Sequence, residues 1–443
     1  MGRKNQVVTI VGAGSTRIPA LIGSLIEYKK EFPLKKLILF DIDKNRLEAL
    51  EDYIRLTMEK YYDEVELVFT DDENKAYIGT DFVFCNMRAG NFDMRSLDEK
   101  IPLKYGLVGQ ETCGPGGFAY GMRSIGAMIH MVKKVREYAP DAWILNYTNP
   151  AAIVAVALDK VFPDDKRILN ICDQPYSMIR SFAKILNISM YDIEPRYFGL
   201  NHFGWFTNLY YSPTGEDLLP KLKKYLKEND FKPYNAEQRE ASWLEAYKSV
   251  NKMLSFFPEY LPNTYLRYYF FPEEIVKECN PNFTRSDEAL AGREKQVLDI
   301  CKKVMIQKSL KGIPFLSGAV HGNMMVEVAD SIAYDLKKLF VVIVRNEGTI
   351  SNLPDDAMVE VAGELTKYGA VPYKVGKIGT FYKGLIEGQY AYEKLTVEAY
   401  LESDYQKALQ ALTINRTVVN PFKAEAVLND LMEANKEYWY LRR

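Results

Sequence analysis

The sequence predicts an α/β protein in which a doubly wound parallel sheet is followed by an α+β domain. Short β-branched strands alternate with amphipathic helices from residue 7 to about residue 195, a pattern typical of parallel strands joined by helical crossovers. A glycine turn directly follows the first strand, as in Rossmann-like sheets. Beyond residue 195 this alternation stops. We therefore expect a Rossmann-like domain over residues 1–195 and an α+β domain over residues 196–443.

The elements of the first domain follow from apolar periodicity. A β-branched run such as VVTIV is consistent with a buried parallel strand, and apolar residues at three- and four-residue steps indicate helices. The expected strands are Val7–Val11, Lys36–Asp41, Leu67–Thr70, Asp81–Met87, Trp143–Tyr147 and Ile168–Cys172. The expected helices are Arg17–Lys30, Lys44–Tyr62, Gly117–Tyr138, Ala151–Leu158 and Tyr176–Leu186.

The second domain has a different pattern. Aromatic residues make Tyr197–Tyr211 strand-like, and Leu339–Val344 is a second apolar strand. The charged helical segments are Ala236–Lys248, Arg285–Gln307, Thr396–Ala411 and Ala424–Tyr438. The chain has no repeat and no long linker, so we expect the two halves to pack closely.

Composition excludes several classes of function. Lys and Arg total 57 against 59 Asp and Glu, a formal charge of −2, which argues against a nucleic-acid-binding surface. The apolar run Ala151–Leu158 is far shorter than the ~20 residues that cross a bilayer, so no membrane association is expected. Five cysteines without a CxxC motif indicate a reducing cytoplasm rather than a disulfide framework.

The first chemical motif is the turn Gly12-Ala13-Gly14-Ser15 after the first strand. Glycines there let the backbone approach a pyrophosphate, and the following helix presents free N–H groups to the anion. Asp41 ends the second strand, where an acid can accept a hydrogen bond from a ribose hydroxyl. A plain glycine turn with a solvated Asp is the alternative. We favour a dinucleotide site formed by Gly12, Gly14, Ser15 and Asp41.

The second motif is Cys172, at the end of the strand before Asp173-Gln174-Pro175, together with His202 of Gly199-Leu200-Asn201-His202. The carboxyl ends of parallel strands face the ligand crevice. A thiolate and an imidazole suit a transition-metal ion that keeps open positions for substrate. Their spacing is no metal signature, and a buried Cys with a core His is the favoured alternative from the residues alone.

Two loops could also reach the crevice. The segment Val108–Gly117 holds four glycines and a proline, which implies unusual backbone angles and suits either ligand contact or a structural connection. Asn149, before Pro150, ends another strand. An ordinary helix start is the favoured interpretation of that Asn-Pro pair.

These motifs together resemble the family-4 glycoside hydrolases. The resemblance is carried by residues 12–15 (GAGS), 87–117, 146–151 (NYTNPA), 170–175 (NICDQP) and 199–205 (GLNHFGW), and continues through residues 261–269, 280–285 and 394–400. It thus spans almost the whole chain. It implies an enzyme that requires NAD and Mn²⁺ or another divalent transition metal. The subgroup most similar is that of the 6-phospho-α-glucosidases, which act on α-linked 6-phosphoglucosides such as maltose 6'-phosphate.

The resemblance also assigns roles. Cys172 and His202 match the metal ligands of the family, and Tyr265 matches the base that removes the proton from C2 of the sugar. Glu111 matches an acid that tunes this tyrosine, and Asp173 matches the general acid for an α-linked leaving group. Asp173 is the main reason for choosing the α-glucosidase subgroup.

Substrate contacts by the same resemblance fall on Arg95, Asn149 and Arg285, with the arginines suited to hydroxyls and phosphate. The implied reaction is NAD-dependent oxidation at C3, elimination of the leaving sugar, addition of water and re-reduction, which releases glucose 6-phosphate. Members of the family are commonly homodimers or homotetramers, so the same is expected here.

Three alternatives stay open. One is a 6-phospho-β-glucosidase or an α-galactosidase-type member of the same family. Another is an NAD-dependent dehydrogenase of the lactate or malate type, whose first domain this one resembles. The last is a module that binds NAD without turnover.

Overall fold

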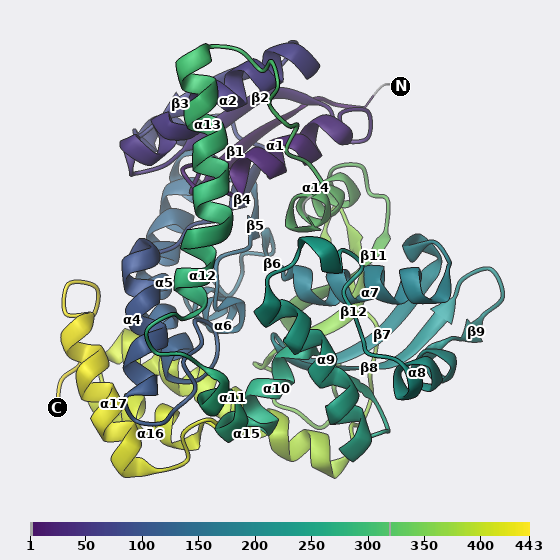
Figure 1. Cartoon of the computed structure of the whole chain (residues 1–443), viewed down its shortest axis with the longest axis vertical. Coiled ribbons are helices and arrows are strands. Elements are labelled where there is room, and N and C mark those ends of the chain that lie inside the picture. The colour runs from purple at the N-terminus through teal and green to yellow at the C-terminus, as the bar shows by residue number, and fades with distance from the viewer. Residues whose placement is uncertain (1–2, 319) are drawn as a thin grey trace.

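The structure, a computed structural model, describes residues 3–318 and 320–443. It contains a nine-stranded sheet in the order β13-β12-β11-β6-β5-β4-β1-β2-β3, and a smaller sheet in the order β10-β8-β7 with β9 paired to β8. Helices cover both faces of the large sheet (Figure 1). The chain therefore combines a Rossmann-like sheet with an α+β region, as the sequence predicts.

Six parallel strands form the N-terminal part of the large sheet. They are β1 (Gln6–Val11), β2 (Leu34–Phe40), β3 (Glu66–Thr70), β4 (Phe82–Cys85), β5 (Trp143–Asn146) and β6 (Ile168–Asn170). All six lie where β-branched runs predict them. Alternate residues of β1 point to opposite faces: Ile10 packs in one core and Val11 in the other.

The helices that cover this sheet alternate with its strands. They are α1 (Ile18–Glu27), α2 (Lys44–Tyr61), α3 (Glu73–Ala76), α4 (Asn91–Leu103), α5 (Gly114–Tyr138), α6 (Ala151–Val161) and α7 (Asp173–Leu186). Leu21 of α1 and Leu47 of α2 pack on one face, whereas Met128 of α5 and Val154 of α6 pack on the other. Helices α3 and α4 were not predicted.

Three strands from the C-terminal half extend the same sheet. These are β11 (Lys338–Arg345), β12 (Met358–Thr366) and β13 (Gly369–Pro372), all antiparallel. The junction is the pairing of Ile343 on β11 with Asn170 on β6. Only β11 was predicted. The expected boundary at residues 195 and 196 therefore separates segments that share one sheet, and the division into two domains stays a prediction.

The predicted single strand Tyr197–Tyr211 is wrong. It is a hairpin of β7 (Ile193–Leu200) and β8 (Phe203–Tyr211), with β9 (Glu216–Asp217) and β10 (Leu261–Pro262) beside β8. The chain reverses at Asn201 and His202, and His202 has a φ of 61°. An Asn-His turn of this kind has no strong sequence signal, because glycine is the usual residue in the left-handed region.

The remaining helices surround the small sheet and the C-terminus. They are α8 (Leu219–Glu228), η2 (Ala236–Gln238), α9 (Ala241–Phe256), η3 (Thr264–Leu266), α10 (Arg267–Phe270), α11 (Pro272–Glu278), α12 (Arg285–Ala289), the π-helical η4 (Leu290–Glu294), α13 (Lys295–Gln307), α14 (Val320–Ala333), α15 (Thr380–Glu402), α16 (Tyr405–Ile414) and α17 (Pro421–Ala434), with η1 (Met190–Asp192) after α7. Helix α13 runs beside α2, and α17 lies beside α4 (Figure 1).

Two helix predictions need correction. The segment Ala236–Lys248 is not a single helix, because η2 ends at Gln238, the backbone is extended at Arg239 and Glu240, and α9 begins at Ala241. The segment Thr396–Ala411 is not a single helix, because α15 ends at Glu402 and α16 begins at Tyr405. Ser403 has a φ of 55°, and the Asp404 side chain accepts a hydrogen bond from the Lys407 N–H. Asp404 therefore starts a new helix, although the spacing of apolar residues in the sequence continues across this break. None of the helices in the described part of the chain is long and apolar enough to cross a membrane.

Candidate active site

A cavity of about 1770 Å³ lies along the carboxyl ends of the parallel strands. Gly12 follows β1, Asn86 follows β4, Tyr147 follows β5 and Cys172 follows β6, and all four residues line it. Residues from η3, α12 and α14 close the cavity from the other half of the chain. The site therefore occupies the position where open α/β sheets bind ligands.

The glycine turn has the geometry of a dinucleotide cradle. Gly12 has a φ of 82°, and a Cβ added there would lie 2.6 Å from the Asn86 carbonyl oxygen. The Gly14 N–H donates a 2.7 Å hydrogen bond to Oδ2 of Asp41, and Ser15 lines the cavity beside them. The turn has no space for a side chain and leaves its backbone free to approach a phosphate, so NAD fits this end of the site.

Cys172 and His202 meet inside the cavity. Cys172 Sγ lies 3.4 Å from His202 Nε2, and both side chains are buried. A cation bonded to sulfur at ~2.3 Å and to nitrogen at ~2.1 Å can contact both atoms at that separation. Burial lowers the pKa of His202 to about 3, so the imidazole is neutral, as a metal ligand must be. The pair therefore fits a divalent cation.

No third His, Cys, Asp or Glu joins this pair in the part of the chain that the structure describes. Burial, followed by the charges of Glu360 and Asp173, raises the pKa of the Cys172 thiol well above its usual range. A bound cation reverses that direction, because coordination deprotonates a thiol. A two-residue site of this kind leaves most coordination positions to a ligand.

Tyr265 lies flat against this pair. Its ring is stacked on the His202 ring, with centroids 3.7 Å apart and planes within 1°. The short helix η3 begins after Asn263, whose side chain accepts a hydrogen bond from the Tyr265 N–H and fixes the loop. Burial raises the pKa of Tyr265, whereas the positive charge of Arg285 opposes that rise.

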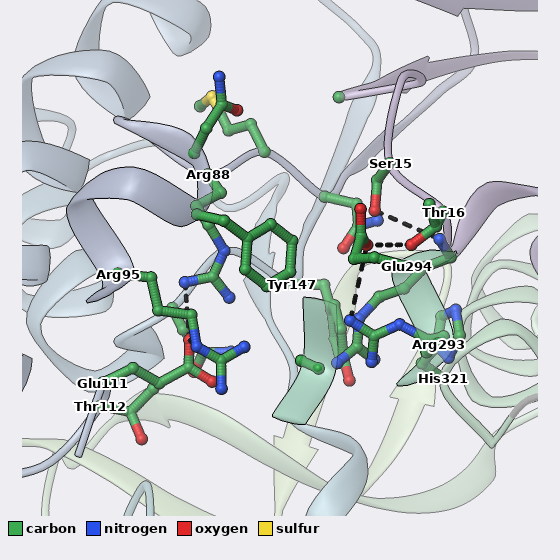
Figure 2. Close-up of a pocket in the computed structure, with 18 of the residues that line it drawn as sticks. Ser15, Thr16, Arg88, Arg95, Glu111, Thr112, Tyr147, Arg293, Glu294 and His321 are labelled. Atoms are coloured by element: carbon green, nitrogen blue, oxygen red, sulfur yellow. Dashed lines mark hydrogen bonds and ion pairs between the residues drawn. The ribbon is translucent and has the colours of Figure 1, made fainter. Parts of the chain in front are cut away.

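Glu111 lies within a group of arginines. Its Oε2 is 2.6 Å from Nη1 of Arg88 and 3.2 Å from Nε of Arg95, and Figure 2 shows this group on one side of the cavity. Burial alone would raise the pKa of Glu111, but the charges of Arg88, Arg95 and Arg285 outweigh it and hold the pKa below its usual range. Glu111 is therefore ionised.

Asp173 and Asn149 complete the set of predicted residues. Asp173 is the first residue of α7 and lines the cavity next to Cys172. The Asn149 Oδ1 atom is buried and has no hydrogen-bond partner among the described residues. An unpartnered buried acceptor that lines a cavity indicates a ligand contact. All the predicted site residues line this one cavity, except Gly14, whose N–H holds Asp41 at its wall.

Comparison with known families decides the class of the protein. Residues 7–188 match the model of the family 4 glycosyl hydrolases, and residues 197–418 match that of the family 4 glycosyl hydrolase C-terminal domain. The chain belongs to glycosyl hydrolase family 4.

Individual members of the family match over nearly the whole chain. A phospho-α-glucosidase of Clostridium acetobutylicum is 45% identical, and the match covers 98% of this chain and 99% of the relative. A crystal structure of a 6-phospho-α-glucosidase from gut microorganisms, in complex with NAD and Mn²⁺, is 48% identical with a TM-score of 0.96, covering 99% and 100% of the two chains. A second such structure, with NAD and glucose 6-phosphate, is 40% identical with a TM-score of 0.94 and covers the same shares.

This family 4 chain also has cavity residues that sequence reasoning missed. Glu294 accepts a hydrogen bond from the Thr16 hydroxyl and lies 3.1 Å from Nη2 of Arg46, which ties η4 to the glycine turn. Figure 2 shows Glu294 beside Arg293 and His321, across the cavity from Arg95. No local motif marks these residues, because they reach the site only through the packing of α12–α14 on the sheet.

Proposed function

We propose that the chain hydrolyses α-linked 6-phosphoglucosides, such as maltose 6'-phosphate, and releases glucose 6-phosphate with the help of NAD and Mn²⁺. The proposal depends mainly on the way four features of the site are arranged. A thiol–imidazole pair, a tyrosine stacked on the imidazole and a glycine cradle all face the same cavity. The similar proteins named 6-phospho-α-glucosidase, and the NAD, Mn²⁺ and glucose 6-phosphate in related crystal structures, support the same activity.

Each cofactor has residues suited to it. Gly12, Gly14 and Ser15 would hold the pyrophosphate of NAD and Asp41 its ribose, while Cys172 and His202 would hold the cation. When bound, the nicotinamide exchanges hydride with C3 of the sugar and the cation acts as a Lewis acid on the neighbouring oxygens.

Tyr265 is the proposed base. Its phenolate oxygen would take the proton from C2, which an adjacent carbonyl group at C3 makes acidic. Its position against His202 places it beside any ligand of the cation. The Arg285 charge favours the phenolate, and Glu111 would tune the base through its electrostatic interaction with Arg285.

Asp173 is the proposed general acid. It would donate its proton to the oxygen of the leaving sugar as the bond at C1 breaks. Its place at the start of α7, next to Cys172, lets it reach a sugar oxygen beside the cation. Arg95 and Arg285 would bind hydroxyls or the phosphate, and Asn149 a hydroxyl, since its Oδ1 is buried without a partner in the described structure.

The cellular location and the assembly of the enzyme are part of the same proposal. A phosphorylated disaccharide is made inside a cell, and all five cysteines are free thiols, so we place the enzyme in the cytoplasm. We also infer a homodimer or homotetramer with a Rossmann-like domain over residues 1–195 and an α+β domain over residues 196–443.

Paired substrates test the proposal. Purified protein is assayed with p-nitrophenyl α- and β-glucoside 6-phosphates, with and without NAD and Mn²⁺, in the presence of a thiol reductant. We expect hydrolysis of the α-substrate only when both cofactors are present. Activity that survives removal of both cofactors contradicts the mechanism. Faster turnover of the β-substrate contradicts the anomeric assignment, and net accumulation of NADH indicates a dehydrogenase instead.

A further inference from the structure

Two side chains at the N-terminal end of helix α9 line the cavity and have no role in the proposed reaction so far. Arg239, just before the helix, and Trp243, in its first turn, are both half-buried and line the cavity. We propose that they form the binding site for the departing sugar, so that they set which aglycone the enzyme accepts. This inference rests on the proposed function and adds to it the part of the site that holds the leaving group.

The position of Trp243 follows from its neighbours. Its ring packs edge-on against Tyr265, with centroids 6.0 Å apart and planes at 84°. In a pyranose ring C1 is bonded to C2, whereas C5, which carries the phosphorylated C6, lies across the ring from C2. A residue beside the base that acts on C2 can therefore reach a group attached to C1, whereas the phosphate is attached on the far side of the sugar ring.

The packing of α9 on α7 gives a second reason. The Tyr247 hydroxyl lies 2.9 Å from the Ser177 hydroxyl. Trp243 precedes Tyr247 by one helical turn, and Asp173 precedes Ser177 by one turn. Both preceding residues line the same cavity. The indole therefore shares the cavity wall with the carboxyl group that would protonate the leaving oxygen.

Arg239 has donors that the chain itself does not use. Its Nε donates a 2.9 Å hydrogen bond to Oδ1 of Asn235, which orients the guanidinium group. Within the described residues no hydrogen bond is formed by its two Nη atoms, and the guanidinium carbon lies 5.6 Å from the Trp243 ring centroid. Free donors next to an aromatic surface suit a neutral sugar, which has hydroxyl oxygens and an apolar ring face.

The local framework keeps this end of α9 in place. The Ser242 hydroxyl donates a 2.7 Å hydrogen bond to Oε2 of Glu288 on α12. Arg285, also on α12, lies 5.1 Å from the Trp243 ring centroid. The proposed aglycone site therefore joins α9 to the helix that carries a predicted substrate residue.

Two substrates that differ only in the leaving group test the proposal. The values of kcat/KM for maltose 6'-phosphate and for methyl α-glucoside 6-phosphate are compared in wild type, Arg239→Gln and Trp243→Phe, with Arg196→Gln on β7 as the control outside the cavity. Loss of a hydrogen bond from a charged donor weakens binding by roughly tenfold or more. We expect Arg239→Gln to lower the disaccharide-to-methyl ratio of kcat/KM by about that factor, and Arg196→Gln to leave the ratio unchanged.

Each outcome has a defined meaning. Equal losses on both substrates overturn the proposal, because they place Arg239 at the phosphorylated glucose rather than at the leaving sugar. An unchanged ratio in both cavity variants also overturns it. Product inhibition by glucose gives an independent measurement, and we expect weaker inhibition in Arg239→Gln. If wild type hydrolyses neither substrate, the proposed function fails and not this assignment alone.

Discussion

At the scale of single residues, the site depends on Tyr265 and its surroundings. The phenol ring lies against the His202 imidazole, and burial raises its pKa while Arg285 opposes the rise. In the protein without cofactors the phenol is therefore protonated at neutral pH. In the proposed mechanism it would act as a base only when positive charge is added beside it, so proton removal would depend on the bound cation.

Replacing Tyr265 by Phe tests this role. The Phe ring can keep the stacking on His202 but lacks the proton acceptor, so kcat should fall by about 10² to 10⁴-fold. NAD binding, followed by calorimetry, should persist because the glycine turn is untouched. Tyr210→Phe on β8 is the matched control. If Tyr265→Phe retains near-normal kcat, another group is the base.

Glu393 makes a separate prediction about stability. Burial, with a smaller contribution from the charge of Glu360, raises its pKa to about 8, and Gln389 donates a 2.8 Å hydrogen bond to it. Between the unfolded pKa of 4.5 and the folded value, the native state keeps a proton that the unfolded state releases. Stability therefore falls as pH rises through this window, by up to about 1.4 kcal/mol per pH unit.

Urea unfolding at pH 5.5, 6.5 and 7.5 measures this effect. Glu393→Gln removes the titration while it keeps the shape of the side chain, so the variant should gain stability relative to wild type as pH rises. Glu387→Gln, on the same helix and paired with Lys383 at the surface, should follow the wild-type profile. Parallel profiles for Glu393→Gln and wild type contradict the assignment.

At the scale of elements, the glycine turn joins strand β1 to helix α1 and needs glycine for two reasons. Gly12 has a left-handed φ, and its α-carbon lies against the backbone that follows β4. A side chain there would strain the turn and fill the space beside Asn86. The first strand, the turn and the following helix thus form one unit that the sequence alone identifies.

Gly12→Ala should weaken NAD binding by roughly five- to thirtyfold, because the added methyl group displaces the turn from its left-handed conformation, which costs a non-glycine residue about 1–2 kcal/mol. Gly215→Ala is the control, because Gly215 has a φ of 75° and no atom within 4 Å of the added Cβ. Fluorescence titration with NADH measures both variants. Wild-type affinity in Gly12→Ala would falsify the proposed cradle.

Elements differ in how well the sequence predicts them. The six parallel strands were predicted because each is a short apolar run between helices. Cys172 and Asp173 were predicted to lie in the site because they come just after β6, at the carboxyl end of the sheet. Strands β12 and β13 were missed, since their pairing depends on β11 meeting the distant β6. The turn at His202 was missed because its backbone is left-handed although the residue is not glycine, so the sequence carries no local turn signal. Residues such as Glu294 reach the site only through tertiary packing.

At the scale of the whole molecule, the two halves share one core. Leu21 of α1 and Met324 of α14 lie in the same buried cluster, and β6 pairs on one side with β11. The cavity is likewise lined from both halves. Neither half closes the site alone.

A fragment of residues 1–195 should therefore not fold to a stable state, because it exposes the edge of β6 and the face of α1 that α14 covers. We expect the full chain to unfold in one thermal transition and the fragment to show none, by near-ultraviolet circular dichroism. A fragment that melts cooperatively and binds NAD contradicts this account and marks an autonomous domain.

The exchange of one proton tests the central claim that a base removes the C2 proton during hydrolysis. Maltose 6'-phosphate is hydrolysed in D₂O with NAD and Mn²⁺, and the glucose 6-phosphate is examined by proton NMR, with glucose 6-phosphate incubated without enzyme as the control. Removal of the C2 proton by Tyr265, followed by return of a solvent-derived hydron to C2, predicts deuterium at that carbon. Product that keeps its original hydrogen at C2 contradicts the account.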